Sequence, residues 1–359
     1  MIPSLQSWRF IFALMIFMHH FPVDGVGLFN AGGTCGVSFF LILSGFVMSV
    51  GYAEKVEREE FNYRNYLKKR LTRIYPLHLL CLLVAAAMIV VSGTFGIKNG
   101  VVFCINAVLM QSWIPLQGIY FSFNAVSWCL SDLLFFYMVF PPLSKFFGRA
   151  GTKKTAVMAG VAIILYFVVL CVIPENLSHP LLYISPIFRL LDFAIGMLLY
   201  RLYKNLLNGK NKILYSLRQL PVIVKSIAEL IPVAILVLCI QIFPSIPQKL
   251  IYASFWWIPS CLIVLVYAIN SQIGGGGLLT KILQNKPLVY LGNISFSFYM
   301  VHQLGIRILG TMIDRINMAM AWQILMALYL AVILVASNTV NRFYEKPATS
   351  YLNSKLIRQ

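Results

Sequence analysis

The chain has 359 residues, of which 60% are hydrophobic and only 11% charged, and it carries a formal net charge of +18. This composition excludes a soluble globular domain, because predominantly apolar runs of about 20 residues recur along it and each is long enough to cross a bilayer. No alternating pattern typical of a transmembrane β-barrel is visible, so we predict an all-α, polytopic membrane helical bundle.

We expect a single domain over residues 1–359 with about ten transmembrane helices. The first segment lacks a basic region followed by a small-residue cleavage site, so it is interpreted as a retained span and not as a signal peptide. The ten predicted spans lie near residues 7–22, 35–51, 76–92, 126–143, 156–173, 183–200, 230–244, 251–270, 287–305 and 322–341.

The positive-inside rule orients these spans. The connections 52–75, 144–155 and 201–229 carry seven, four and six Lys or Arg residues, so all three are expected in the cytoplasm. An even number of spans must then separate them, which makes the apolar run 101–116 a re-entrant or interfacial segment on the outer side. Both termini are therefore expected to be cytoplasmic, and the positive charge is attributed to membrane orientation and not to nucleic acid.

The first predicted span contains an arginine and two histidines in a segment otherwise suited to lipid. Such residues cost about 2.5–3.5 kcal/mol at the centre of a bilayer helix, so they usually face the protein interior and have a function. Arg9 and His20 are eleven residues apart, close to a whole number of helical turns, and so share one face, whereas His19 lies about 100° away. The alternative is that Arg9 snorkels at a helix end and that the histidines are merely interfacial.

A basic cluster, NYLKKRLTRIYPLH, precedes the third span and contains Lys68, Lys69, Arg70 and Arg73. Arg70 and Arg73 are one helical turn apart, and paired guanidinium groups suit phosphate through forked, charge-assisted hydrogen bonds. A basic run at this place is also explained by membrane orientation or lipid headgroup contact.

Two carboxylates fall inside predicted spans, and this scarcity makes them informative. Asp192 follows Arg189 by three residues, so the two can form an ion pair on one helical face. Predicted depth brings Asp132 and Arg189 to the outer half of the membrane, together with His20 and His302. Structural roles, such as an intramembrane bridge for Arg189 and Asp192 or packing for Asp132, remain alternatives.

The polar residues thus divide into an inner group of arginines able to hold a phosphorylated carrier and an outer histidine with carboxylates at similar depth. A histidine oriented by an acidic partner can take a proton from a hydroxyl nucleophile. No serine nucleophile elbow, HExxH motif or P-loop competes for this role, and the seven cysteines have no CxxC spacing, so no metal is expected. A transporter or flippase of a glycolipid or anionic solute, and a non-catalytic scaffold, are the rival interpretations.

Several motifs in order along the chain resemble those of the acyltransferase 3 family of integral membrane acyltransferases. The resemblance rests on Arg9 and His20 with ten residues between them, and on GVSFFLILSGFVM, which includes Ser44. It rests also on Arg70 and Arg73 in RLTRIYP, on SWCLSDLLFFYMVFP, which includes Trp128, and on FRLLDFAIGM. YLGNISFSFYMVHQ, which includes His302, and FYEKP, which includes Glu345, complete the series.

The resemblance implies transfer of an acyl group, most simply acetyl from acetyl-CoA, to a hydroxyl of a cell-surface glycan or lipid-linked sugar. It implies His20 as general base or transient acyl carrier, Arg9 beside the incoming donor arm, and Arg70 and Arg73 at the acyl-CoA phosphates. The implied supporting residues are Ser44, Trp128, Asp132, Arg189, Asp192, His302 and Glu345. Acyl-CoA is then a substrate and not a permanently bound cofactor, and the implied location is the cytoplasmic membrane of a bacterium.

The chain departs from the family pattern in the fourth motif. Cys129 stands where the family has serine, and Leu133 stands where it commonly has glutamate, with the carboxylate moved to Asp132. One residue along a helix turns a side chain by about 100°, so the sequence leaves open whether Asp132 substitutes for that glutamate. The chain stops soon after Pro347, so we expect no soluble extracytoplasmic domain of the kind that some members carry.

Overall fold

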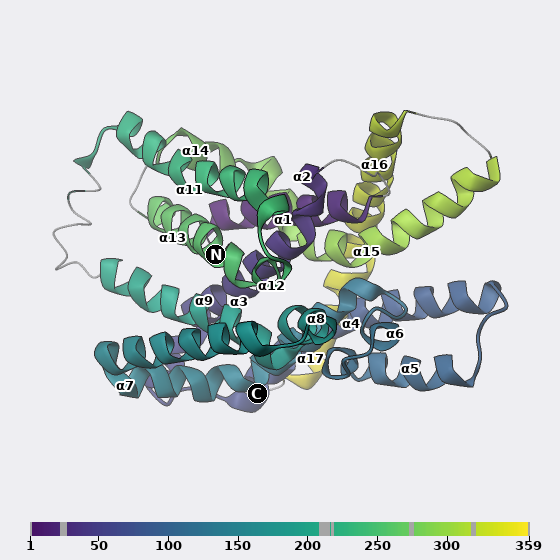
Figure 1. Ribbon diagram of the computed structural model, residues 1–359, viewed down its shortest axis with the longest axis horizontal. Helices are drawn as coiled ribbons and strands as arrows, with labels where there is room; N and C mark the ends of the chain where they lie inside the picture. Colours follow the sequence, from purple (N-terminus) through teal and green to yellow (C-terminus); the bar gives the residue numbers. More distant parts are fainter. Residues whose placement is uncertain are drawn as a thin grey trace.

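The computed structural model describes residues 2–21, 27–207, 216, 219–272, 276–316 and 321–357, and this part of the chain contains no strand. Figure 1 shows a helical bundle with its longest axis along the main helices. The long helices are α1 (Pro3–His20), α3 (Gly32–Glu57), α4 (Tyr63–Val91), α7 (Trp128–Val172), α9 (Pro186–Leu207), α11 (Val222–Ile242), α13 (Trp257–Gln272), α15 (Lys286–Ile316) and α16 (Trp322–Val340).

Short helices connect the long ones, and two of them, η3 and η6, are π-helical. They are α2 (Gly27–Asn30), α5 (Ile97–Ala107), η1 (Gln111–Trp113), α6 (Gln117–Tyr120), η2 (Ala125–Ser127), α8 (Glu175–Ser178), η3 (His179–Ile184), η4 (Phe243–Ser245), α12 (Gln248–Ile251), η5 (Ser254–Trp256), α14 (Leu278–Leu283), η6 (Asn341–Glu345) and α17 (Lys346–Leu356).

Seven helices among the described residues are long and apolar enough to cross a membrane, and an eighth span arises if the bent pair Glu175–Ile184 and Pro186–Leu207 counts as one. Two of the seven come from α7, which breaks at Gly151, where a φ of 69° is a conformation that glycine adopts without strain. The other two predicted spans fall on α1 and α15, which carry more polar residues and are not among the eight. The expected count of ten and the position of the termini therefore stay predictions.

The helix that begins the run 101–116 is shorter than the candidate spans. Its helix, α5, has eleven residues and is about 16 Å long, roughly half of the hydrocarbon thickness. It lies beside α4 (Figure 1) and is followed by the short helices η1 and α6. This length agrees with the sequence-based interpretation of the run as something other than a span, which stays a prediction.

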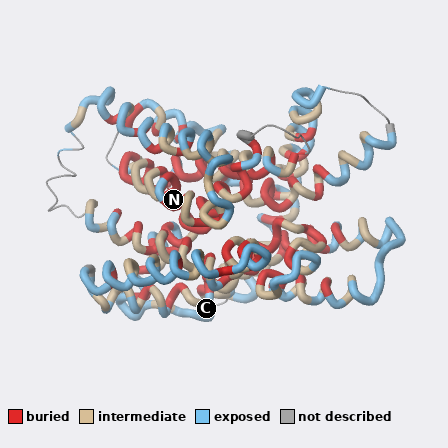
Figure 2. The backbone as a smooth tube through the Cα atoms, viewed as in Figure 1, coloured by how far each residue is buried: buried red, intermediate tan, exposed pale blue. Residues whose placement is uncertain are grey.

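The outer helices expose apolar side chains. In the second part of α7, Lys153–Val172, only 11% of the most apolar stretch is buried. The tube in Figure 2 is accordingly pale blue at the periphery and red at the centre of the bundle. Such apolar exposure is expected where a helix faces lipid, and it would be a liability in water.

The centre of the bundle depends on a close crossing of α3 and α9. A Cβ atom on Gly45 would lie 1.9 Å from the Phe193 carbonyl oxygen, and one on Gly196 would lie 1.9 Å from the Ile42 carbonyl oxygen. The two backbones therefore touch directly, an arrangement typical of small residues at membrane helix contacts. This contact explains why both the SGF and the AIGM motifs contain glycine.

A second close crossing joins α1 to α15. A Cβ atom on Gly292 would lie 2.0 Å from the backbone oxygen of Gln6. The two helices run in the same direction, because Gln6 lies beside Gly292 and His20 lies beside His302. This direction agrees with the sequence topology, in which both helices are odd-numbered spans.

The described parts of the three basic connections lie on one side of the molecule. Two of these connections begin at the end of the first part of α7 and at the end of α9. Ion pairs join both places to glutamates in the last turn of α3 or just after it. These pairs are Lys145–Glu59 at 3.0 Å, Arg149–Glu59 at 3.8 Å, Arg201–Glu57 at 3.9 Å and Lys204–Glu54 at 3.0 Å. The hydrogen bond from Lys145, then its charge and that of Arg149, lower the pKa of Glu59.

Candidate active site

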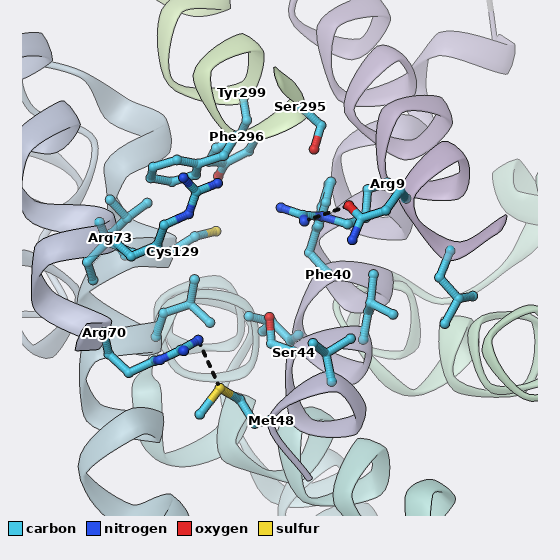
Figure 3. Close-up of a pocket in the computed structure, with 18 of the residues that line it drawn as sticks. Arg9, Phe40, Ser44, Met48, Arg70, Arg73, Cys129, Ser295, Phe296 and Tyr299 are labelled. Atoms are coloured by element: carbon cyan, nitrogen blue, oxygen red, sulfur yellow. Dashed lines mark hydrogen bonds between the residues drawn. The ribbon is translucent and has the colours of Figure 1, made fainter. Parts of the chain in front are cut away.

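A cavity of about 550 Å³ lies between α1, α3, α4, α7 and α15. Figure 3 shows Arg9 entering it from one side and Arg70 and Arg73 from the other. Lys346 adds a fourth cationic side chain, and no carboxylate lies in the described lining. The uncharged polar lining residues are Gln6, Ser44, Tyr137, Asn293, Ser295 and Tyr299. A partly apolar cavity with this charge suits an anionic, partly hydrophobic ligand.

Arg9 projects from α1 into the cavity, as its position on the first helix predicted (Figure 3). Its Nη1 donates to Gln6 Oε1 at 3.0 Å, one turn earlier on the same helix. No described carboxylate forms an ion pair with Arg9. The guanidinium therefore keeps donors free for a ligand.

Arg70 and Arg73 both line the cavity but have different partners. Arg70 Nη2 donates to the Tyr52 hydroxyl at 2.8 Å, and its guanidinium lies 5.2 Å from the centre of that ring. Arg73 Nη1 forms a 2.5 Å ion pair with Glu345 Oε1. Of the two arginines, only Arg73 has a carboxylate partner in the described chain, so Arg70 is the freer of the two for an anionic ligand.

His20 and His302 form a hydrogen-bonded pair between α1 and α15. The distance from His302 Nε2 to His20 Nδ1 is 3.1 Å, and His20 Nδ1 is also 2.9 Å from the Ile16 carbonyl oxygen. His302 is fully buried, and its Nδ1 lies 2.6 Å from the Tyr299 carbonyl oxygen. The carboxylate expected beside His20 is thus replaced by a second histidine.

These contacts favour one pair of neutral tautomers. A carbonyl oxygen only accepts, so each ring carries its proton on Nδ1. His302 Nε2 then holds a lone pair and accepts a hydrogen bond from His20 Nδ1–H. The same N–H also donates to the Ile16 carbonyl oxygen. Nε2 of His20 is left unprotonated, which is the form that a general base requires.

Tyr299 links the histidine pair to the cavity. Its side chain lines the cavity (Figure 3), while its backbone oxygen lies against His302. The Tyr299 hydroxyl donates to the Val126 carbonyl oxygen at 2.8 Å, which fixes the ring in place. The ring of Phe40, another lining residue, is 6.1 Å from that of Tyr299.

The supporting residues predicted from the second and fourth motifs differ in whether they line the cavity. Ser44 lines the cavity, and so does Cys129 (Figure 3). Trp128 points elsewhere and packs 5.0 Å from the Tyr183 ring. Asp132 is fully buried outside the cavity lining, and neither carboxylate oxygen has a hydrogen-bond partner of normal geometry in the described chain.

Arg189 and Asp192 form the ion pair that their spacing predicted, with 3.6 Å between Nη1 and Oδ2 and both side chains fully buried. Arg189 also donates to the Tyr252 carbonyl and to Ser38, and Asp192 accepts from Trp257 at 3.0 Å. The pair therefore ties α9 to α3 and α13. It makes no hydrogen bond to either histidine, so the predicted outer cluster divides into two separate sites.

Some site residues were not found from the sequence. Tyr52 follows Ser44 and Met48 at intervals of four, so it shares their helical face, and this spacing was a usable signal. Ser297 and Asn341 hydrogen-bond to the Glu345 carboxylate, and Lys346 enters the cavity. Ser297 has its partner 48 residues away, so no local pattern marks it, whereas Asn341 lies four residues before Glu345 and this one-turn spacing was a usable signal.

The fold and the site define a membrane-embedded helical protein with a cation-lined cavity next to a histidine pair, in which His302 is buried and His20 is partly buried. Within that class, the chain matches the acyltransferase 3 family, described as an acyltransferase domain, over residues 2–338. The chain belongs to this family of acyltransferases.

The similar curated proteins carry related names. The chain is 26% identical to the acyltransferase MdmB of Streptomyces mycarofaciens, over 99% of this chain and 93% of that protein. It is 25% identical to a putative acetyltransferase of Acidianus two-tailed virus, over 89% and 88%. A putative O-acetyltransferase of Staphylococcus aureus is 24% identical over 84% of this chain and 50% of that protein. No solved structure matches the chain.

Proposed function

We propose that this protein transfers an acetyl group from cytoplasmic acetyl-CoA to a hydroxyl of a cell-surface glycan or lipid-linked sugar. The single observation that carries the proposal is the cavity lined by Arg9, Arg70 and Arg73, whose lining residue Tyr299 contacts the His20–His302 pair. Membership of the acyltransferase family and the names of its relatives support the reaction class.

The donor binds in the cavity. Arg70, which has no carboxylate partner in the described chain, takes a CoA phosphate by charge-assisted hydrogen bonds, and Arg73 contributes from one turn away. The pantetheine arm passes Arg9 along α1 toward His20. The eleven-residue separation of Arg9 and His20 corresponds to about 16 Å of helix, which is of the right order for this arm.

His20 Nε2 removes the proton from the acceptor hydroxyl, and the hydroxyl oxygen attacks the thioester carbonyl carbon. The tetrahedral intermediate collapses by breaking the carbon–sulfur bond, and the CoA thiolate takes the proton from the His20 imidazolium. His302 positions the His20 ring by accepting from its Nδ1. The products are the acetyl ester and free CoA, so atoms and charge balance.

The test is CoA release by the purified protein in lipid nanodiscs supplied with acetyl-CoA and a glycan extract of its own cell. We expect the His20→Gln variant to fold and bind acetyl-CoA but to lose transfer by at least about 100-fold, since general-base catalysis contributes 10²–10⁴-fold. The wild type should release CoA and yield an acetylated glycan, detected by its mass.

His19→Gln is the matched control, because the His19 ring lies against Gly33 and edge-on to the His20 ring but takes no part in the hydrogen bonds of the His20–His302 pair. It should retain transfer within a few-fold of the wild type. Full transfer by a correctly folded His20→Gln protein would show that the base is another group. Failure of the wild type to bind acetyl-CoA at all would instead favour a transporter.

A further inference from the structure

The C-terminal segment forms part of the cavity wall. The family match ends at residue 338, whereas η6 and α17 follow it and pack along α4. Lys346, the first residue of α17, lines the cavity, and Glu345, the last residue of η6, pairs with Arg73. The two residues that reach the site thus lie beyond the matched segment.

Glu345 joins three elements. Its side chain is fully buried, and Oε1 accepts from Arg73 of α4. Oε2 accepts from Ser297 of α15 and, at 2.9 Å, from Asn341 of η6. A buried carboxylate with all of these partners is held firmly, so the guanidinium that it binds is held firmly as well.

Arg73 is fixed on one side only. Its side chain is 38% exposed and faces the cavity, while Glu345 is fully buried behind it. The guanidinium also lies 5.7 Å from the centre of the Phe296 ring. A guanidinium braced in this way presents its remaining donors to a ligand at low entropic cost.

Further contacts secure the C-terminal helix to α4. Thr72 donates to Asn353 at 2.6 Å, and Thr349 donates to the Thr72 carbonyl oxygen at 3.1 Å. Lys68 donates to the Leu356 carbonyl oxygen at 2.8 Å. The position of Lys346 in the cavity therefore follows from the docking of α17 on the basic end of α4.

We propose that Glu345 is a positioning residue that holds Arg73 for the anionic part of the donor, and that Lys346 makes the C-terminal segment part of the donor site. This inference rests on the proposed function for the identity of the donor. Glu345 does not touch the donor itself and acts through Arg73. Its effect is therefore on donor affinity and not on the chemical step.

The experiment measures acetyl-CoA affinity of the full chain in nanodiscs, for the wild type and for Glu345→Gln, Arg73→Ala and the double variant. We expect Glu345→Gln to bind roughly tenfold more weakly, with kcat at saturating acetyl-CoA near the wild-type value. In the Arg73→Ala background the same change should have less than about a twofold effect, because the group that Glu345 positions is gone.

Glu59→Gln is the matched control, since it removes a glutamate from an exposed ion pair with Lys145 away from the cavity. Lys346→Gln should weaken acetyl-CoA binding several-fold, and it tests whether the C-terminal segment is part of the donor site. If Arg73→Ala does not fold, Arg73→Gln takes its place in the cycle.

Wild-type affinity in Glu345→Gln, or losses that multiply in the double variant, would overturn the positioning role. Wild-type affinity in Lys346→Gln would remove the C-terminal helix from the donor site. If the wild type binds acetyl-CoA and releases CoA, either of these two results leaves the proposed function intact. A wild type that does not bind acetyl-CoA overturns both.

Discussion

Arg70 and Arg73 lie one turn apart on α4, yet they occupy different electrostatic environments. Arg70 contacts a tyrosine hydroxyl and a methionine sulfur, whereas Arg73 contacts a fully buried carboxylate. Loss of Arg70 removes a cation from the cavity wall and leaves no buried charge unpaired. Loss of Arg73 removes a cation and also leaves Glu345 buried without its counter-ion.

This difference predicts unequal effects on stability. Arg73→Ala should lower the free energy of unfolding by about 1–3 kcal/mol, since an unpaired buried charge bears its desolvation penalty, and Arg70→Ala should cost less. Thermal unfolding of both variants in detergent, without donor, measures this. Adding Glu345→Gln to Arg73→Ala should restore part of the loss. Equal unfolding temperatures for the two alanine variants would contradict this account of the Glu345 environment.

At the scale of elements, the bundle depends on helices that touch backbone to backbone. At the crossing of α3 and α9, Gly45, which follows the cavity residue Ser44, lies against Phe193, and Gly196 lies against Ile42. A side chain at either glycine would force the helices apart. The position of the cavity wall formed by α3 therefore depends on two glycines, which have no side chain that could bind or react.

Gly45→Ala should be destabilising by about 1–3 kcal/mol, the usual cost of overpacking, because its Cβ would overlap the Phe193 carbonyl oxygen. Gly51→Ala, six residues later on the same helix, has nothing within 4 Å of its Cβ and should be neutral or slightly stabilising. Thermal unfolding of the two variants compares them directly. A Gly45→Ala protein as stable as Gly51→Ala would mean that the helices separate freely.

At the scale of the whole molecule, two of the predicted cytoplasmic connections are joined to the end of α3 by ion pairs. The positive-inside rule needs these connections on one side of the membrane, and the fold brings them to one side of the bundle. The same side carries α17 and the basic end of α4 that lines the cavity. A cytoplasmic donor would thus approach the cavity from this side.

Cysteine labelling in intact cells tests this orientation, in a background whose seven native cysteines are replaced. Leu116→Cys, in the segment predicted to be outside, should react with a membrane-impermeant maleimide. Lys153→Cys, in the second basic connection, should react only after the cells are permeabilised, because the reagent cannot reach the cytoplasm. Both positions are exposed in the structure, so accessibility alone does not separate them. The opposite labelling pattern would reverse the topology.

Sequence reasoning alone predicts the helical membrane class, a non-spanning run at 101–116, and the arginines that line the cavity. These follow from properties of single segments, because the cost of a charge in hydrocarbon and the length needed to cross a bilayer do not depend on distant residues. The Arg189–Asp192 ion pair could be predicted for the same reason, since its two members are only three residues apart on one helix.

Which polar groups meet depends on how the helices pack. His20 pairs with His302 across 282 residues of sequence, and Arg73 pairs with Glu345 across 272. Predicted depth placed His20, Asp132, Arg189 and His302 together, but depth leaves the rotation and the neighbours of each helix open. The close crossings at Gly45 and Gly292 set those neighbours, and helix packing in a bilayer is governed by such contacts and not by hydrophobicity.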